Sequence, residues 1–143
     1  MRFTATAVTA LLFGANAAMA AEDVSIADFS AHKTGVSGTA AGAVDGVSFK
    51  LTGTGAKDLS CSAAANQIAS GVPTNVITCG DSKYRFAVTE NTDASSFTLQ
   101  IFHETGTATG FSGSGKIATN CRSGGGNNEV CSQTQSPTTI HIQ

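Results

Sequence analysis

The chain has 143 residues, and its eight Lys and Arg against ten Asp and Glu give a formal net charge of −2. A chain of this length suits a single compact domain with a modest hydrophobic core. The basic residues are scattered singly, whereas phosphate backbones are bound by clustered Lys and Arg. The composition therefore argues against nucleic acid and anionic membranes as partners.

Residues 1–20 have the pattern of a secretory signal peptide. Arg2 supplies the positive n-region, residues 5–13 form the apolar h-region, and the last three residues, Ala-Met-Ala, match an A-x-A cleavage site. The apolar stretch is too short for a bilayer, which needs about 20 apolar residues. We therefore expect cleavage after Ala20 and a secreted, extracellular single domain formed by residues 21–143.

Most of the remaining sequence alternates apolar and polar residues with period 2, which is typical of half-buried β-strands. Turn-forming Gly, Pro, Asn and Asp residues separate the alternating runs. Many short strands at such spacing predict an all-β fold, a compact antiparallel β-barrel or sandwich. In chain order, the strands are predicted at residues 23–32, 47–51, 57–62, 75–79, 84–88, 97–101, 115–121 and 138–142.

Three further segments interrupt this strand pattern. Residues 62–70 are the only helix candidate, because their alanines and Ile68 permit one or two helical turns. The Gly-, Ser- and Asn-rich residues 123–128 are predicted to form a loop. Binding concentrates in loops on a rigid scaffold, so residues 34–46 and 123–129 are the candidate contact surface.

Four cysteines, Cys61, Cys79, Cys121 and Cys131, lie in the region expected to reach an oxidising compartment. Their even number predicts two disulfides, and neither C-x-x-C spacing nor a histidine cluster indicates a metal site. The sequence alone allows three pairings. We prefer Cys61–Cys79 with Cys121–Cys131 because each closes a short local loop, which in the chain-entropy view contributes about 3 kcal/mol.

Residues 110–116 match the glycine and lysine spacing of a phosphate-binding P-loop. Such a loop needs Ser or Thr after the lysine to hold magnesium, and a helix whose N-terminus faces the phosphates. Here Ile117 follows Lys116, and Cys121 arrives before a helix could form. We therefore favour a glycine-rich hairpin over a nucleotide site.

His103, with Glu104 beside it, is the main candidate for acid-base catalysis. Neighbouring residues of a strand point to opposite faces, so these two side chains cannot easily act together. His103 continues an apolar stripe and is predicted to be its polar end, whereas His141, between two isoleucines, is predicted to face outward. We therefore predict no catalytic, cofactor-binding or metal-binding residues and no enzyme activity.

A secreted guanyl-specific ribonuclease of the fungal type is the least favoured alternative. Such enzymes are also small, acidic and disulfide-bonded, and they depend on His, Glu and Arg. They carry an amphipathic helix against their sheet, and no such helix can be placed in this sequence. Arg85 and Glu90 lie near one strand but share no face.

Short motifs, none of them a catalytic signature, are spread over nearly the whole region after the signal peptide. They are VSIADFS at 24–30, VSFKL at 47–51, LSC at 59–61, CGDSKYRF at 79–86, SFTLQIFH at 96–103, CR at 121–122, CSQ at 131–133 and IHI at 140–142. By these motifs the chain resembles the fungal secreted proteins similar to the major allergen of Alternaria, which include elicitors of plant defence. The resemblance implies a compact β-barrel, the same sequential disulfides and no established catalytic residues.

The resemblance also implies an effector that is released by a fungus and triggers plant immunity or necrosis. Our first hypothesis is therefore an allergen-like effector that binds a plant apoplastic protein, with thaumatin-like defence proteins as one candidate partner. The alternative is a carrier of a small apolar, flavonoid-like ligand in a pocket lined by Phe49, Phe86 and Phe97, which are otherwise simply core.

The resemblance bears on oligomeric state as well. The Alternaria allergen dimerises through an extra cysteine near its mature N-terminus. This chain has Ala31, His32 and Lys33 in the comparable region. A covalent dimer is therefore not expected, and the prediction is a monomer or a non-covalent dimer.

Overall fold

The computed structural model of the protein describes residues 21–38, 40–68 and 71–143, so the predicted signal peptide lies outside the described residues. No helix within these ranges has the length and apolar character needed to span a membrane. The described part contains nine strands: β1 Glu22–Ser37, β2 Ala40–Gly53, β3 Ala56–Ala63, β4 Ile77–Thr78, β5 Tyr84–Glu90, β6 Ser96–Gly106, β7 Thr109–Gly125, β8 Asn128–Gln133 and β9 Thr138–Ile142.

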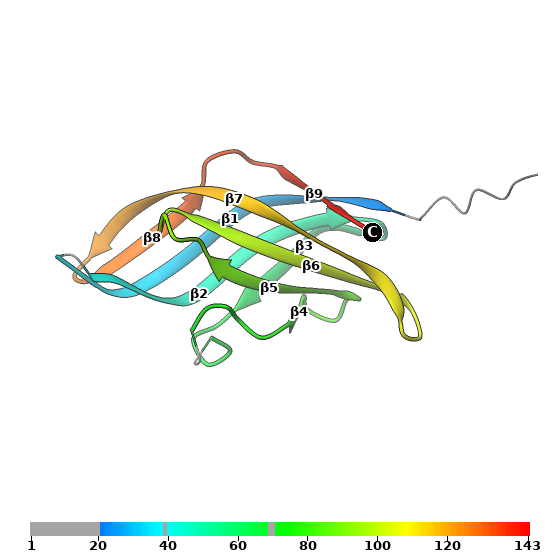
Figure 1. Ribbon diagram of the computed structural model, residues 1–143, viewed down its shortest axis with the longest axis horizontal. Helices are drawn as coiled ribbons and strands as arrows, with labels where there is room; N and C mark the ends of the chain where they lie inside the picture. The colour runs from blue at the N-terminus through cyan, green and yellow to red at the C-terminus, as the bar shows by residue number, and fades with distance from the viewer. Residues whose placement is uncertain (1–20, 39, 69–70) are drawn as a thin grey trace, which may run out of the picture.

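The strands form one antiparallel sheet that curls into a nearly closed barrel (Figure 1). The strand order is β3-β2-β1-β8-β7-β6-β5-β4, and β9 pairs with β1. Alternate residues of the strands point inward and build a continuous apolar core. The predicted all-β barrel class is thereby confirmed.

Phenylalanine rings occupy the centre of this core. The ring centres of Phe49 and Phe86 lie 4.9 Å apart, and Phe29 lies 6.2 Å from Phe49 and 5.4 Å from Phe97. All four side chains are buried. Complete burial of such a side chain stabilises the fold by roughly 1.5–3 kcal/mol. The three residues considered for an apolar ligand pocket therefore lie in the core. Phe86 contacts Phe49, and Phe29 connects Phe49 with Phe97.

β8 and β9 behave as two halves of one interrupted strand. β8 pairs with residues 30–33 of β1, and β9 pairs with residues 22–26 along the same edge. Between them β1 changes register against β2, and Asp28 has a left-handed φ of 54°. The interruption leaves backbone groups of β1 without a strand partner, and buried backbone groups need one.

The side-chain amide of Gln133 supplies these missing partners. Its Oε1 accepts a hydrogen bond from the N–H of Phe29 at 2.9 Å, and its Nε2 donates to the carbonyl of Ile26 at 3.0 Å. Nε2 also lies 2.6 Å from the carbonyl oxygen of Gln135. A carboxamide has the donor and acceptor of a peptide group, so Gln133 substitutes for strand pairing across the break.

Two glycines of β7 allow β9 to close the barrel. A Cβ atom at Gly113 would overlap the carbonyl oxygen of His141, and one at Gly115 would lie 2.8 Å from Ile140 Cγ1. Next to them, Ser112 and Gln143 exchange both backbone hydrogen bonds, at 3.2 and 3.1 Å. β9 therefore bridges β1 and β7. The segment 110–116, whose glycine and lysine spacing matches a P-loop, lies within β7. The residues that follow it also belong to β7 and not to a helix.

Three predictions of local structure were wrong. Within the predicted contact segment 34–46, residues 34–37 and 40–46 are not a loop but belong to the strands β1 and β2. In the segment 123–128, only residues 126–127 are a turn between β7 and β8. Positive φ values at Gly125 and Gly126 let that turn be tight, so strand pairing runs almost to the tip. In the helix candidate 62–70, the first two residues belong to the end of β3. The next residues make one turn, in which the N–H of Ile68 donates to the carbonyl of Ala64. Residues 69–70 lie outside the described part.

The preferred disulfide pairing, Cys61–Cys79 with Cys121–Cys131, is confirmed. Cys61 lies in β3 and Cys79 directly follows β4, so the first disulfide joins the two end strands of the sheet. The second links directly paired residues of β7 and β8. The bonds therefore brace the two places where sheet pairing ends or turns sharply.

Replacing Gly113 with alanine should destabilise the protein by about 2–3 kcal/mol, because the new methyl group would overlap the backbone of β9. Ser114→Ala, at the exposed neighbouring position of the same strand, should stay within about 0.5 kcal/mol of the parent. Urea unfolding of both variants measures the difference. Equal midpoints for the two variants would contradict the closure described for β9.

Replacing Gln133 with methionine should cost about 2 kcal/mol, because it leaves the backbone groups of Phe29 and Ile26 without partners. Gln135→Met is the matched control, since Gln135 is exposed and contributes only its carbonyl. Thermal unfolding reports the stability. Slower amide exchange at Phe29 in the Gln133→Met variant would show that the side chain does not protect this amide.

Candidate functional site

The two predicted contact segments lie at the same end of the barrel. The β1–β2 and β7–β8 hairpins run side by side there (Figure 1), and the N–H of Val36 donates to the carbonyl of Asn127 at 2.9 Å. We call residues 34–38 and 123–128 together the hairpin end. Segments about ninety residues apart in sequence therefore form one surface.

The hairpin end is polar but carries no charge. Residues 34–38 and 123–128 include no Asp, Glu, Lys, Arg or His. Hydroxyl and amide groups are presented instead, on the exposed side chains of Thr34, Ser37, Ser123, Asn127 and Asn128. Such a surface can form several hydrogen bonds with another protein without removing charges from water.

A buried ion pair braces the hairpin end from inside. The Lys33 side chain is 1% exposed, and its Nζ donates to Glu90 Oε1 at 2.6 Å and to the carbonyl of Ala94 at 2.9 Å. The same ammonium lies 5.8 Å from the centre of the Phe97 ring. Lys33 thus ties β1 to β5 and to the turn after β5.

A second polar cluster closes the opposite end of the barrel. Glu22 Oε1 accepts hydrogen bonds from the Tyr84 hydroxyl at 2.5 Å and from the Thr54 N–H at 2.6 Å, while Oε2 lies 2.6 Å from His103 Nδ1. The rings of Tyr84 and His103 stack with centres 3.9 Å apart. We call Glu22, Thr54, Tyr84 and His103 the Glu22 cluster. It joins the first residue of β1 to β5 and β6.

The hydrogen bonds of the Glu22 cluster shift its ionisation. Burial raises the pKa of Glu22, but hydrogen bonds from Tyr84, Thr54 and His103 outweigh it and hold the pKa below its usual range. Burial, and then the Glu22 carboxylate, raise the pKa of the Tyr84 hydroxyl above its usual range. Glu22 is therefore a carboxylate and Tyr84 a neutral donor at neutral pH.

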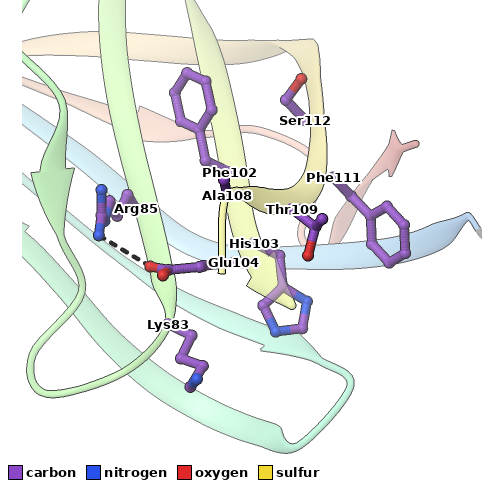
Figure 2. Close-up of a pocket in the computed structure, with 10 residues that line it drawn as sticks. Lys83, Arg85, Phe102, His103, Glu104, Ala108, Thr109, Phe111 and Ser112 are labelled. Atoms are coloured by element: carbon purple, nitrogen blue, oxygen red, sulfur yellow. Dashed lines mark hydrogen bonds and ion pairs between the residues drawn. The ribbon is translucent and has the colours of Figure 1, made fainter. Parts of the chain in front are cut away.

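An open groove of about 420 Å³ lies beside the Glu22 cluster, between the ends of β5, β6 and β7. We call it the His103 groove. Figure 2 shows Arg85 and Glu104 facing each other across one side of it and the rings of Phe102 and Phe111 at its margins. His103 belongs to both the groove and the Glu22 cluster, so it connects the interior with this surface.

The ionisable residues considered from sequence do not form one catalytic group. His103 contacts Glu22, whereas Glu104 accepts a hydrogen bond from Arg85 at 3.0 Å on the outer face. His141 is exposed, as predicted, and pairs with Asp23 at 2.8 Å. The alternation argument that separated His103 from Glu104 was therefore correct.

The residues of the ribonuclease comparison also lie apart. Arg85 pairs with Glu104 on the outer face, and Glu90 pairs with the buried Lys33. No α-helix occurs in residues 21–38, 40–68 and 71–143. The helix that those enzymes pack against their sheet has no counterpart in the described part of this chain.

The buried polar contacts of Glu22, Lys33 and Tyr84 were not predicted from the sequence. Glu22 and Lys33 flank the predicted strand 23–32 by one residue on each side, so both were left outside the pattern. A longer strand would have placed Glu22 on the same face as Val24 and Ile26, which marks it as a polar residue facing the core. Their partners, far away in sequence, carry no comparable signal.

Within the described residues, potential metal ligands converge at Cys121, Glu129 and Cys131. The two cysteines form a disulfide, however, and a disulfide sulfur is not the thiolate that binds a metal. This cluster therefore offers Glu129 alone as a ligand.

Comparison with known proteins identifies relatives along almost the entire chain. A family model described as Alternaria alternata allergen 1 matches residues 26–133. The effector protein PevD1 of the fungus Verticillium dahliae is 43% identical over 157 aligned positions, which cover 99% of this chain and 94% of that protein. A second PevD1 sequence, from strain VdLs.17, has the same identity and coverage.

Solved structures support the fold. A crystal structure of the Alternaria alternata allergen Alt a 1 has a TM-score of 0.66 at 20% identity, covering 85% of this chain and 87% of that one. Another crystal structure of the same major allergen gives 0.63 at 20% identity, covering 85% and 92%. At this identity the likeness concerns the barrel alone.

Glu22→Gln should lower the free energy of unfolding by about 2 kcal/mol near neutral pH, because charged hydrogen bonds are lost in a buried site. The folded pKa of Glu22 is lowered, so its contribution is complete above the unfolded value of 4.5 and is lost as pH falls through the folded value. The difference between parent and variant should therefore shrink below about pH 4.5. Unfolding at several pH values measures it.

Asp23→Asn is the control for this experiment. Its carboxylate pairs with His141 on the surface, where the two side chains are 70% and 59% exposed. Exposed pairs contribute little, so this variant should resemble the parent at every pH. A Glu22→Gln difference that grows on acidification would show that the sign of the Glu22 shift is wrong.

Proposed function

Since the chain belongs to the Alternaria alternata allergen 1 family, we propose that it is a secreted effector that binds a plant protein in the apoplast and thereby modulates host defence. The relative named as an effector supports the class of function. The signal-peptide pattern of residues 1–20 and the two disulfides support export to an oxidising compartment.

The observation that carries the proposal is the convergence of both predicted contact segments at the hairpin end. The Val36–Asn127 hydrogen bond joins them, and the disulfide Cys121–Cys131 cross-links β7 and β8 below their turn. A surface held in this way loses little conformational entropy when it binds. A protein partner would therefore meet a preformed contact surface, and thaumatin-like defence proteins are one candidate for it.

The positions of the ionisable residues support binding rather than catalysis. His103, Glu104 and His141 are each engaged with a different partner, and no two of them contact each other in the described residues. A catalytic acid–base pair must reach one reacting atom together, and these three residues do not supply such a pair. We therefore assign them no catalytic role.

The core packing likewise favours surface recognition over an apolar carrier. Phe49, Phe86 and Phe97 are buried at 3% exposure or less, and aromatic contacts link them to Phe29. A flavonoid-like ligand between these rings would have to displace well-packed side chains. The hairpin end needs no such rearrangement.

Charge introduced at the hairpin end should abolish defence induction in infiltrated leaves. In the double variant Thr34→Arg, Asn128→Arg, both substitutions are at exposed positions of neighbouring hairpins, so folding should be kept while the contact is blocked. Capture of plant proteins from apoplastic fluid on the immobilised protein should fall at least about tenfold, which corresponds to 1.4 kcal/mol or more.

The matched control is Thr105→Arg, Thr107→Arg at the β6–β7 turn. These residues are also exposed threonines, but they lie away from the hairpin end. This variant adds the same charge and should keep both defence induction and capture. If both double variants lose activity while their circular dichroism spectra match the parent, the hairpin end is not the contact surface.

A further inference from the structure

The His103 groove contains one basic side chain that is not used in an ion pair within the described residues. Lys83 is exposed and makes no ion pair within the described residues, whereas Arg85 is paired with Glu104 at 3.0 Å. The Arg85–Glu104 pair contributes no net charge. Lys83 therefore gives the groove its unpaired positive charge.

His103 adds a directed donor to this groove. Its Nδ1 is occupied by Glu22, and every fully buried side-chain nitrogen or oxygen in the described residues has a hydrogen-bond partner. Nε2 has no hydrogen-bond partner within the described residues, so it is not fully buried, and His103 lines the groove. When the imidazole is protonated, Nε2 donates into the groove while Nδ1 donates to Glu22.

The groove also has an apolar side. Phe102 and Phe111 are both half-buried, and their rings lie at the margins of the groove in Figure 2. Thr109 and Ser112, which also line the groove, offer hydroxyl groups. Concave sites with apolar rings and a few convergent polar groups are typical of small-molecule binding.

We propose that the His103 groove binds small ring-bearing carboxylates. The carboxylate would accept hydrogen bonds from Lys83 Nζ and His103 Nε2, and the ring would pack on Phe111, with the hydroxyls of Thr109 and Ser112 nearby. Both an aromatic acid and a sugar acid have this chemistry. The groove is at the other end of the barrel from the hairpin end, so this inference does not depend on the proposed protein partner.

The glutamates near the groove do not prevent it from binding a carboxylate. Glu104 is satisfied by Arg85, and Glu22 is buried beneath His103, where it accepts bonds from Tyr84 and Thr54 as well. Glu22 holds the imidazole by Nδ1 and so directs Nε2 outward. It acts as a positioning residue for His103.

The test is a titration of the purified protein with sodium benzoate and with galacturonate, followed by nuclear magnetic resonance at about pH 5.5, on the acidic side of the range in which histidines in general titrate. Both the Nε2 resonance of His103 and the amide of Phe111 should shift with one or both probes. Benzamide and galactose, which lack the carboxylate, should bind at least about tenfold more weakly. The probe that binds more tightly identifies the source of the carboxylate.

Lys83→Gln should weaken binding of the preferred acid about fivefold or more, because it removes the unpaired charge. Lys57→Gln is the control, since Lys57 is exposed and unpaired in the described residues but lies on β3, outside the groove. Equal loss in both variants, unchanged resonances at His103 and Phe111, or neutral analogues that bind as tightly as the acids would each overturn the proposal. Inorganic phosphate that binds as tightly as the acids would overturn the assignment to ring-bearing ligands.

Discussion

Pairing of β1 along both edges is the constraint on which the barrel depends. One edge is paired with β2 from Ser25 to Ser37, and the other is divided between β8 and β9. A central strand cannot leave its peptide groups unpaired, because each buried group without a partner costs about 1–3 kcal/mol. The bulge at Asp28 and the Gln133 amide are the means by which a divided edge remains fully bonded.

The two ends of β1 also fix its position relative to the far side of the barrel. Glu22 reaches Tyr84 and His103, and Lys33 reaches Glu90, so both charged side chains contact β5 and β6 or their turns. Buried polar contacts add little net stability but are costly to break. A slip of β1 by one residue would break both contacts and turn the core-facing residues outward. These contacts therefore specify the register, while burial of the apolar core supplies most of the stability.

Much of this fold could be predicted from runs in which apolar and polar residues alternate. The runs 84–88 and 97–101 lie in β5 and β6, and the local cysteine pairing followed from short loops. Gly-, Ser- and Asn-rich strands were missed because their pairing comes from backbone bonds to neighbours, which side-chain alternation does not record. The Glu22 cluster was beyond prediction for a similar reason: His103 was assigned to the end of a core stripe, but its partner is 81 positions away.

The two ends of the barrel differ in how freely their side chains can vary. At the hairpin end, backbone pairing and the left-handed glycines at the β7–β8 tip, Gly125 and Gly126, maintain the shape, so exposed side chains can change with effects of about 0.5 kcal/mol or less. At the other end, His103 takes part in both the groove and the Glu22 cluster, so a change there alters ligand chemistry and barrel closure together. The hairpin end can therefore change its surface chemistry without loss of the fold, whereas the chemistry of the groove is tied to barrel closure.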